Sequence, residues 1–170
     1  MPKQVMRRTA ADNVYLHKDF HGALSAGIEF LHRRWGAEAV REYLHQFART
    51  YYAPLSAALR ERGLAAMKEH LERTYEAEGG RITMRCSDDE LLLEVEACPA
   101  VTHMRQRGYA VAELFSETTH TVYQAICEDT PFAVEVLEYD DDTGRSRVRF
   151  YRRLRPPKRN FVAREGGRRR

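Results

Sequence analysis

The chain has 170 residues, of which 43% are hydrophobic and 31% are charged. This balance excludes an intrinsically disordered protein, because a chain of this length and hydrophobicity can bury one real core. No uncharged stretch approaches the ~18 apolar residues that a membrane-spanning helix needs, so we expect no membrane partner.

The N-terminus and the cysteine content both favour a reducing compartment. The first 13 residues include basic ones but lack the apolar stretch of a secretory signal. Three cysteines in a chain without such a signal are typical of reduced thiols or metal ligands rather than of a disulfide framework. We therefore expect a cytoplasmic protein.

The formal net charge is only +3, but the C-terminal end is strongly basic. Nine Lys or Arg residues and one acid, Glu165, lie between Arg152 and Arg170. Such a tail can bind phosphate backbones, although charge runs at chain ends are usually just solvated. We expect a single α+β domain over residues 1–155, followed by a basic, flexible tail over residues 156–170 without a nucleic-acid partner.

Helical spacing of apolar residues predicts about four helices in the first half of the chain, over residues 12–36, 37–53, 55–63 and 64–78. The first begins at a good N-cap, Asp12 or Asn13. Aromatic residues are prominent in the apolar stripes of the first two helices, and we expect both stripes to face the core. The stripes comprise Phe20, Leu24, Gly27, Ile28, Leu31 and Trp35, then Val40, Tyr43, Leu44, Phe47 and Tyr51.

The second half alternates with period two in two places, which predicts two β-hairpins. The first covers residues 82–97 and places Cys86 on its apolar side; the second covers residues 132–151 around a turn at residues 140–144. Between them the spacing predicts a short helix from Pro99 to Gly108 and a longer one over residues 110–127. The expected fold is α+β, with an N-terminal helical layer covering one face of a four-stranded antiparallel sheet.

The stretch between the hairpins holds the residues best suited to bind a metal. Glu117 and His120 are three apart on a predicted helix, so one face carries both. With Cys98 and Cys127 they form a set of two sulfurs, one nitrogen and one oxygen that suits Zn²⁺. Seven residues of straight helix rise ~10.5 Å, however, so Cys127 can share an ion with His120 only if the helix ends early. His103 is then the substitute ligand.

Two other sets of residues are candidates for chemistry. Cys98 is a candidate nucleophile, with His103 or His120 as its base. His17 and His21, with Asp19 between them, lie near the start of the first helix and either face a pocket or are ordinary surface histidines. Six tyrosines on helices or at their ends either line a cavity or belong to the core: Tyr43, Tyr51, Tyr52, Tyr75, Tyr109 and Tyr123.

Over residues 15–154 the chain contains the phrases H-K-D-F-H-G-A-L-S-A-G-I-E-F-L, E-A-C-P-A-V and T-G-R-S-R-V-R-F-Y-R-R. In these phrases it resembles the L-2-amino-thiazoline-4-carboxylic acid hydrolase-like proteins. The resemblance implies hydrolytic opening of a small cyclic C–N bond, with a metal-bound water as the nucleophile if the metal keeps an open position.

The order of helices, hairpin, helix and hairpin also resembles the vinyl-reductase-like small-molecule-binding domain and, more distantly, the haem nitric oxide/oxygen-binding fold. Metal-binding members of the vinyl-reductase-like group bind zinc through a cysteine at a strand end, a Glu-x-x-Cys pair and a further cysteine. The resemblance implies the same roles for Cys98, Glu117, His120 and Cys127, with His120 in place of a cysteine.

Two hypotheses from different classes follow. The first is a small-molecule-binding domain acting as a metal-assisted hydrolase of a cyclic C–N bond, and we expect it to form a homodimer. The second is a non-enzymatic ligand-sensing or structural module in which all four ligands of a structural zinc come from the protein.

Overall fold

The computed structural model describes Lys18 and residues 20–154. The predicted start of the first helix at Asp12 or Asn13 and the predicted tail of residues 156–170 lie outside the described residues. The elements are, in chain order, α1 (Phe20–Trp35), α2 (Ala37–Tyr51), α3 (Ala53–Arg62), α4 (Leu64–Glu78), β1 (Ile82–Cys86), β2 (Glu90–Val95), α5 (Pro99–Gln106), α6 (Glu117–Cys127), β3 (Phe132–Tyr139) and β4 (Ser146–Arg152).

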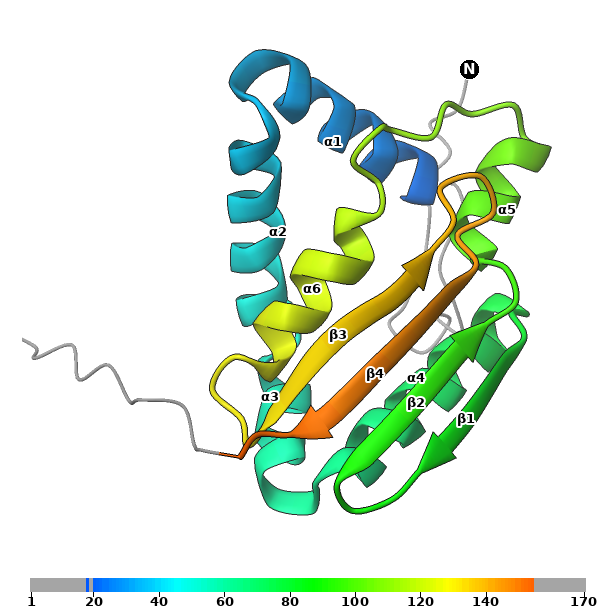
Figure 1. The fold of residues 1–170 in the computed structure, drawn as a ribbon. Coiled ribbons are helices and arrows are strands. Elements are labelled where there is room, and N and C mark those ends of the chain that lie inside the picture. The colour runs from blue at the N-terminus through cyan, green and yellow to red at the C-terminus, as the bar shows by residue number, and fades with distance from the viewer. Residues whose placement is uncertain (1–17, 19, 155–170) are drawn as a thin grey trace, which may run out of the picture.

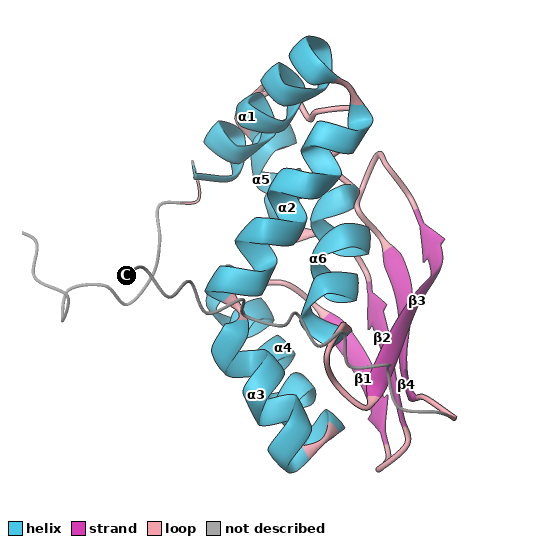
Figure 2. Cartoon of the chain, turned by 90° about the vertical axis from the view of Figure 1, so that its left-hand side faces the viewer, coloured by secondary structure: helices cyan, strands magenta, loops and turns pink. Residues whose placement is uncertain are grey.

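The predicted α+β class is confirmed. The four strands form one antiparallel sheet in the order β1-β2-β4-β3. The helices all lie on one side of this sheet, with α1 and α2 in the outer part of the layer and α6 against the strands (Figures 1 and 2). Because the helices cover only one face, the strands alternate between core and solvent.

The two hairpins join through β2 and β4, and their pairing builds the centre of the core. Leu91 pairs with Phe150 and Leu93 pairs with Val148, so four large apolar side chains point at the helices from adjacent strands. All four are fully buried. This register follows from the pleat, since a slip by one residue would turn the whole apolar set to solvent.

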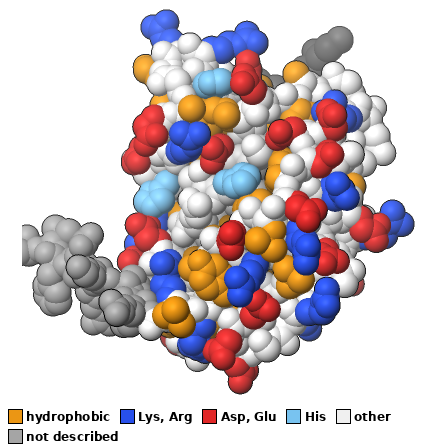
Figure 3. Space-filling model, viewed as in Figure 1, with side chains coloured by type: hydrophobic (Ala, Val, Ile, Leu, Met, Phe, Trp, Pro, Cys, Tyr) orange, Lys and Arg blue, Asp and Glu red, His pale blue; other side chains and the backbone are white. Residues whose placement is uncertain are grey.

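The opposite face of the sheet carries charges of both signs, which are interspersed over the surface in Figure 3. Arg147 lies between two carboxylates, 3.7 Å from Glu94 on β2 and 3.5 Å from Glu138 on β3. The register of the second hairpin also sets Glu135 opposite Arg149 and Glu138 opposite Arg147. These exposed pairs fix orientation more than they stabilise, because surface ion pairs are worth about 0–1 kcal/mol.

The start of α6 differs from the prediction. The helix begins at Glu117 instead of residue 110, and residues 109–116 form turns and irregular backbone. The cause is Ser25, a buried side chain of α1 whose hydroxyl donates to the carbonyl of Ala110 and accepts the N–H of Ala112, both at 2.8 Å. The backbone of this segment therefore bonds to another helix instead of to its own next turn.

The aromatic part of the predicted core stripes is wrong. The buried face of α1 is centred on Ser25 and Ile28, and that of α2 on small or aliphatic side chains. Helix periodicity cannot distinguish these faces from the neighbouring stripes, where residues three or four apart are equally apolar. The exposed aromatic residues of the two helices are Phe20, Phe30, Trp35, Tyr43, Phe47 and Tyr51.

Within the described part of the chain, no helix is both long enough and apolar enough to cross a membrane.

Replacing Phe150 tests the position of the core. Phe150→Ala removes a ring that is 0% exposed at the centre of the sheet, and we expect it to lower the free energy of unfolding by about 3–5 kcal/mol. Leu137→Ala on the exposed side of β3 is the control and should change it by less than about 0.5 kcal/mol. Urea unfolding followed by circular dichroism measures both, and equal losses would contradict this core.

Candidate functional site

Cys98 lies where the loop after β2 becomes α5, and the β3–β4 turn holds it there. It is the N-cap residue of α5, in extended backbone conformation. Its N–H donates to the carbonyl of Thr143 at 2.9 Å. The next residue, Gly144, has φ +65°, and a β-carbon at that position would lie 2.3 Å from the Cys98 Cβ. Only glycine allows the turn to approach this closely.

The thiol of Cys98 faces opposing influences. Burial raises its pKa above the ordinary value, the nearby backbone N–H groups of Val101 and Ala100 lower it, and the carboxylate of Glu78 raises it. Burial dominates, so the thiol form is favoured at neutral pH. The two N–H groups at the first turn of α5 would nevertheless stabilise a thiolate once it forms.

Three tyrosines from three elements lie near this thiol. Tyr75 of α4, Tyr123 of α6 and Tyr139 of β3 are each close enough for the charge of Cys98 to act on their pKa values. Tyr75 and Tyr123 also act on each other's pKa, so their hydroxyls are neighbours. We call Cys98 with these three tyrosines the Cys98 cluster.

The Cys98 cluster places polar groups between the helical layer and the sheet. All three tyrosines are only partly exposed, and burial raises the pKa of each phenol. They therefore remain neutral hydrogen-bond donors across the physiological pH range. One soft nucleophile among neutral donors can bind a small polar molecule and stabilise negative charge that develops on it.

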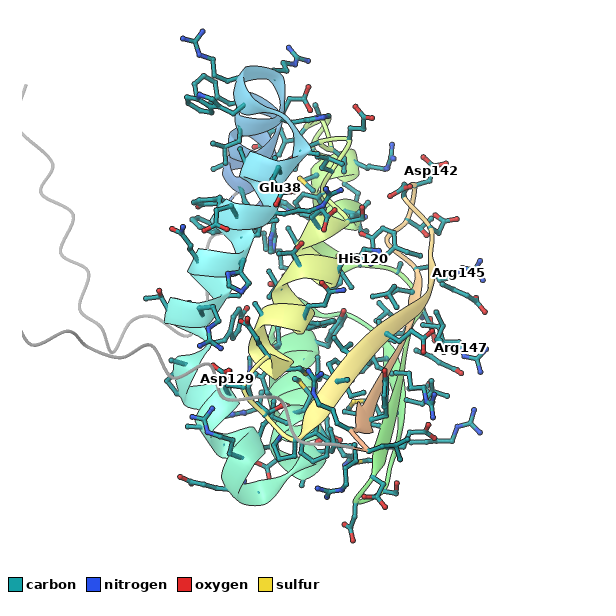
Figure 4. All side chains as sticks on the ribbon, turned by 60° about the vertical axis from the view of Figure 1, so that its left-hand side comes forward. Glu38, His120, Asp129, Asp142, Arg145 and Arg147 are labelled. Carbon is teal, nitrogen blue, oxygen red and sulfur yellow. The ribbon has the colours of Figure 1, made fainter. Side chains whose placement is uncertain are left out.

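Of the predicted bases, His120 lies at the edge of this cluster. Its ring centroid is 5.8 Å from that of Tyr139. Figure 4 shows His120 near one end of α6, on the side that faces the strands, and Asp129 just beyond the other end.

Glu117 is held by groups other than His120. The Arg41 guanidinium on α2 donates to its carboxylate at 2.8 Å, and the Thr121 hydroxyl donates at 2.6 Å. Burial alone would raise the pKa of Glu117, but the hydrogen bonds from Thr121 and Arg41, together with the Arg41 charge, outweigh it and hold the pKa below the ordinary value. This carboxylate therefore links α6 to α2 through Arg41.

Cys127 lies at the last residue of α6 and is buried. Burial raises the pKa of its thiol to about 12, so it remains protonated. The helix runs without a break from Glu117 to Cys127, which keeps His120 and Cys127 about 10.5 Å apart along the axis. Two ligands of one zinc, bonded at ~2.0–2.3 Å, cannot be that far apart.

The four predicted zinc ligands thus do not fit one ion as they are placed. Cys98 lies at the start of α5, Glu117 and His120 lie in the first turn of α6, and Cys127 lies at its far end. Among the residues that the structure describes, no three His, Cys, Asp or Glu side chains are grouped to hold a metal ion. The zinc site stays a prediction that this arrangement does not support.

Two further histidine candidates, His21 and His103, both lie beside Glu78 at the C-terminal end of α4. His21 Nε2 lies 3.1 and 3.2 Å from the two carboxylate oxygens of Glu78, at the C-terminal end of α4. A surface pocket of about 410 Å³ is lined by Glu78, His103 and Lys18. Sequence reasoning connected neither His21 nor Glu78 with Cys98, because they are brought together only by the packing of α1 and α5 on the end of α4. His17 and Asp19 lie outside the described residues.

The remaining candidates differ in whether they belong to the Cys98 cluster. Sequence reasoning missed Tyr139, although its position at the last residue of a predicted strand before a turn was a usable signal. Cys86, predicted to be core, is exposed on the edge strand β1. Tyr43, Tyr51 and Tyr109 are exposed and do not belong to the Cys98 cluster.

Gly144→Ala should displace Cys98. A left-handed backbone costs an alanine about 1 kcal/mol, and here the new methyl group would also overlap Cys98. We expect a loss of about 3 kcal/mol in unfolding free energy and a changed alkylation rate of Cys98, measured by urea unfolding and mass spectrometry. Gly79→Ala is the matched control, because Gly79 has φ +70° with nothing within 4 Å of the added β-carbon, and it should lose only about 1 kcal/mol. Similar losses in both variants would contradict the close contact.

Arg41→Leu should make the protein less stable in a pH-dependent manner. Because the folded-state pKa of Glu117 is lowered, the carboxylate contributes stability above its unfolded pKa, about 4.3, and that contribution is lost as the pH falls through the lower folded value. The deficit of the variant should therefore be largest at pH 7 and vanish in acid, as measured by thermal unfolding. Arg33→Leu, which removes an exposed pair with Glu29, is the control and should have a smaller effect. A deficit that persists at low pH would show that Arg41 acts through packing alone.

The comparisons with known proteins found no match from which a function could be inferred. No protein-family model matches the chain, and no curated protein sequence matches it. The resemblances drawn from its phrases and from its order of elements therefore remain expectations, and the Cys98 cluster is the feature from which a function has to be argued.

Proposed function

We propose that the chain is a small-molecule-binding domain that opens a small cyclic C–N bond by hydrolysis, with Cys98 as the nucleophile. The reaction class is the one implied by the resemblance to L-2-amino-thiazoline-4-carboxylic acid hydrolase-like proteins. The observation that supports it is the Cys98 cluster, in which a partly buried thiol at the start of α5 lies near phenols that stay neutral.

Cys98 is suited to nucleophilic attack by its position. Cys98 is the N-cap residue of α5, where the positive end of the helix dipole favours the thiolate. Tyr75, Tyr123 and Tyr139 supply neutral phenol donors from α4, α6 and β3. A donor fixed before the reaction stabilises developing charge without reorganisation, which is the main electrostatic contribution to catalysis.

A base is needed, because burial keeps Cys98 as a thiol at neutral pH. His120 is the better candidate of the two predicted ones, since its ring contacts Tyr139 within the cluster. His103 lines the outer pocket beside Glu78, so we assign it the second choice. The base takes the thiol proton and later returns it.

The proposed steps balance with one water molecule. The Cys98 S–H bond breaks as the S–C bond to the ring carbon forms, and the base takes the proton. The ring C–N bond then breaks, and the same proton goes to the leaving nitrogen. Water next adds its oxygen to the carbon, the S–C bond breaks, and the remaining proton restores the thiol. No step uses a metal, since the predicted zinc ligands do not fit one ion.

The alternative is a ligand-sensing module without turnover. The raised pKa of Cys98 supports it. A thiol that stays protonated is a poor nucleophile, but it can still line a binding site. In that case the same phenols would bind the ligand and no bond would break.

The test uses L-2-amino-thiazoline-4-carboxylic acid as the probe. We expect the full chain to convert it to the ring-opened product with the gain of one water, followed by nuclear magnetic resonance and mass spectrometry. Cys98→Ala should lower kcat by roughly 1,000-fold, and the rate should rise with pH above neutrality, because the thiolate fraction grows toward the raised pKa. A chelator should leave the rate unchanged.

The control is Cys86→Ser, which removes an exposed cysteine outside the cluster and should keep full activity. His120→Gln and His103→Gln separate the two bases, since only the true base should flatten the rise with pH. Binding without turnover in the parent would favour the sensing module. Full turnover by Cys98→Ala, or loss of turnover with the chelator, would overturn the cysteine mechanism.

A further inference from the structure

The outer face of α1 exposes large aromatic side chains to solvent. Phe20, Phe30 and Trp35 are 62%, 61% and 59% exposed, and the Phe30 and Trp35 rings contact each other edge to face at 5.7 Å. A soluble chain normally buries such rings, which carry about 150–250 Å² each. α1 lies on the side of the helical layer away from the sheet (Figure 2), so no other described element covers this face.

A groove runs along the same face. It encloses about 1060 Å³ between α1 and the segment 108–113. Three small residues of α1 line it, Gly22, Ala23 and Ala26, and the opposite wall includes Tyr109 and Val111. Further along the helix, a β-carbon added at Gly27 would meet nothing within 4 Å. The face thus presents bulky rings at one place and a hollow beside small side chains at another.

We propose that the occupant of this face is a second copy of the chain, bound through antiparallel packing of the two α1 helices. The helices cross with a two-fold axis between Ala26 and Gly27. Residues at equal distances from that axis then lie opposite each other, so Phe30 of one copy faces the partner's Ala23, next to the groove. By symmetry the same contact forms twice.

The spacing of the face suits such a helix pair. Ala23, Ala26, Phe30 and Arg33 are separated by three, four and three residues, which keeps them in one row along an α-helix. In the same register Phe20 lies opposite the partner's Arg33, at the end of α1 that is basic. A guanidinium over an aromatic face is worth about 0.5–1 kcal/mol at exposed sites. Antiparallel packing also sets opposite ends of the two helix dipoles side by side.

The exposed rings supply part of the area that a dimer needs. Three rings with about 60% of their surface exposed offer roughly 350 Å², and apolar patches of this size are often functional. The flanking part of α1 and the groove walls would supply the rest of the ~800 Å² per partner of a standard interface. Interfaces of this size have dissociation constants from micromolar to picomolar, so the area does not fix the affinity.

The test is sedimentation equilibrium of the full chain over a wide concentration series, from roughly 10 nM to 100 µM. We expect a monomer–dimer equilibrium that Ala23→Glu and Phe30→Ser each weaken by about 100-fold, because each substitution acts twice in the interface. Both positions are exposed, so circular dichroism should show an unchanged fold. Tyr51→Ser is the matched control, since Tyr51 is 66% exposed but lies on α2, and it should leave the equilibrium unchanged.

Cross-linking tests the register independently. In a Cys86→Ser background, which removes the exposed native cysteine, Gly27→Cys lies beside the axis and should form a disulfide-linked dimer. Tyr51→Cys in the same background should not. A chain that stays monomeric at every concentration, a dimer unaffected by Ala23→Glu, or a monomer that binds anionic vesicles through Phe30 and Arg33 would each overturn the proposal.

Discussion

The contact between the β3–β4 turn and the first residue of α5 determines the geometry of the site. The hydrogen bond from Cys98 to Thr143 and the missing side chain at Gly144 bring a turn of the second hairpin against the residue that follows the first hairpin. The antiparallel pairing of β2 with β4 makes this approach possible, because it sets the end of β2 beside the start of β4. The position of one thiol therefore depends on sheet register as much as on its own helix.

The helical layer adds the other half of the site. α4 and α6 each contribute one tyrosine, Tyr75 and Tyr123, and both are only partly exposed. Their pKa values respond to each other and to the charge of Cys98. The helical layer thus brings polar groups to a core that is largely apolar.

Much of the fold could be predicted, because each hairpin and each of α2 to α5 is encoded within its own stretch of sequence. The second hairpin was predicted with its turn, since alternation and turn residues suffice to define it. The start of α6 could not, because Ser25 lies 85 residues from Ala110 and no local signal announces that bond. The aromatic stripes failed for a related reason, since periodicity finds apolar faces but not what covers them.

The candidate site was predictable only in part. Cys98 and His120 were named from their chemistry, and the structure brings both near Tyr139. Glu117 and Cys127 were named on the same grounds, yet Arg41 holds the first and an unbroken helix removes the second. The distance between two residues of one helix can be predicted from their spacing in the sequence. The distance between residues of different elements depends on tertiary packing, which a single sequence does not reveal.

The two hydrogen bonds of Ser25 hold the irregular segment between α5 and α6 against α1. Residues 109–116 have no regular secondary structure, and such connections normally open freely. Here one hydroxyl holds the segment at two backbone positions, Ala110 and Ala112, from within a buried helix face. The N–H of Ala112 is consequently shielded from solvent, and its hydrogen exchange will be as slow as that of a helical amide. We therefore expect residues 109–116 to open only when α1 itself is displaced.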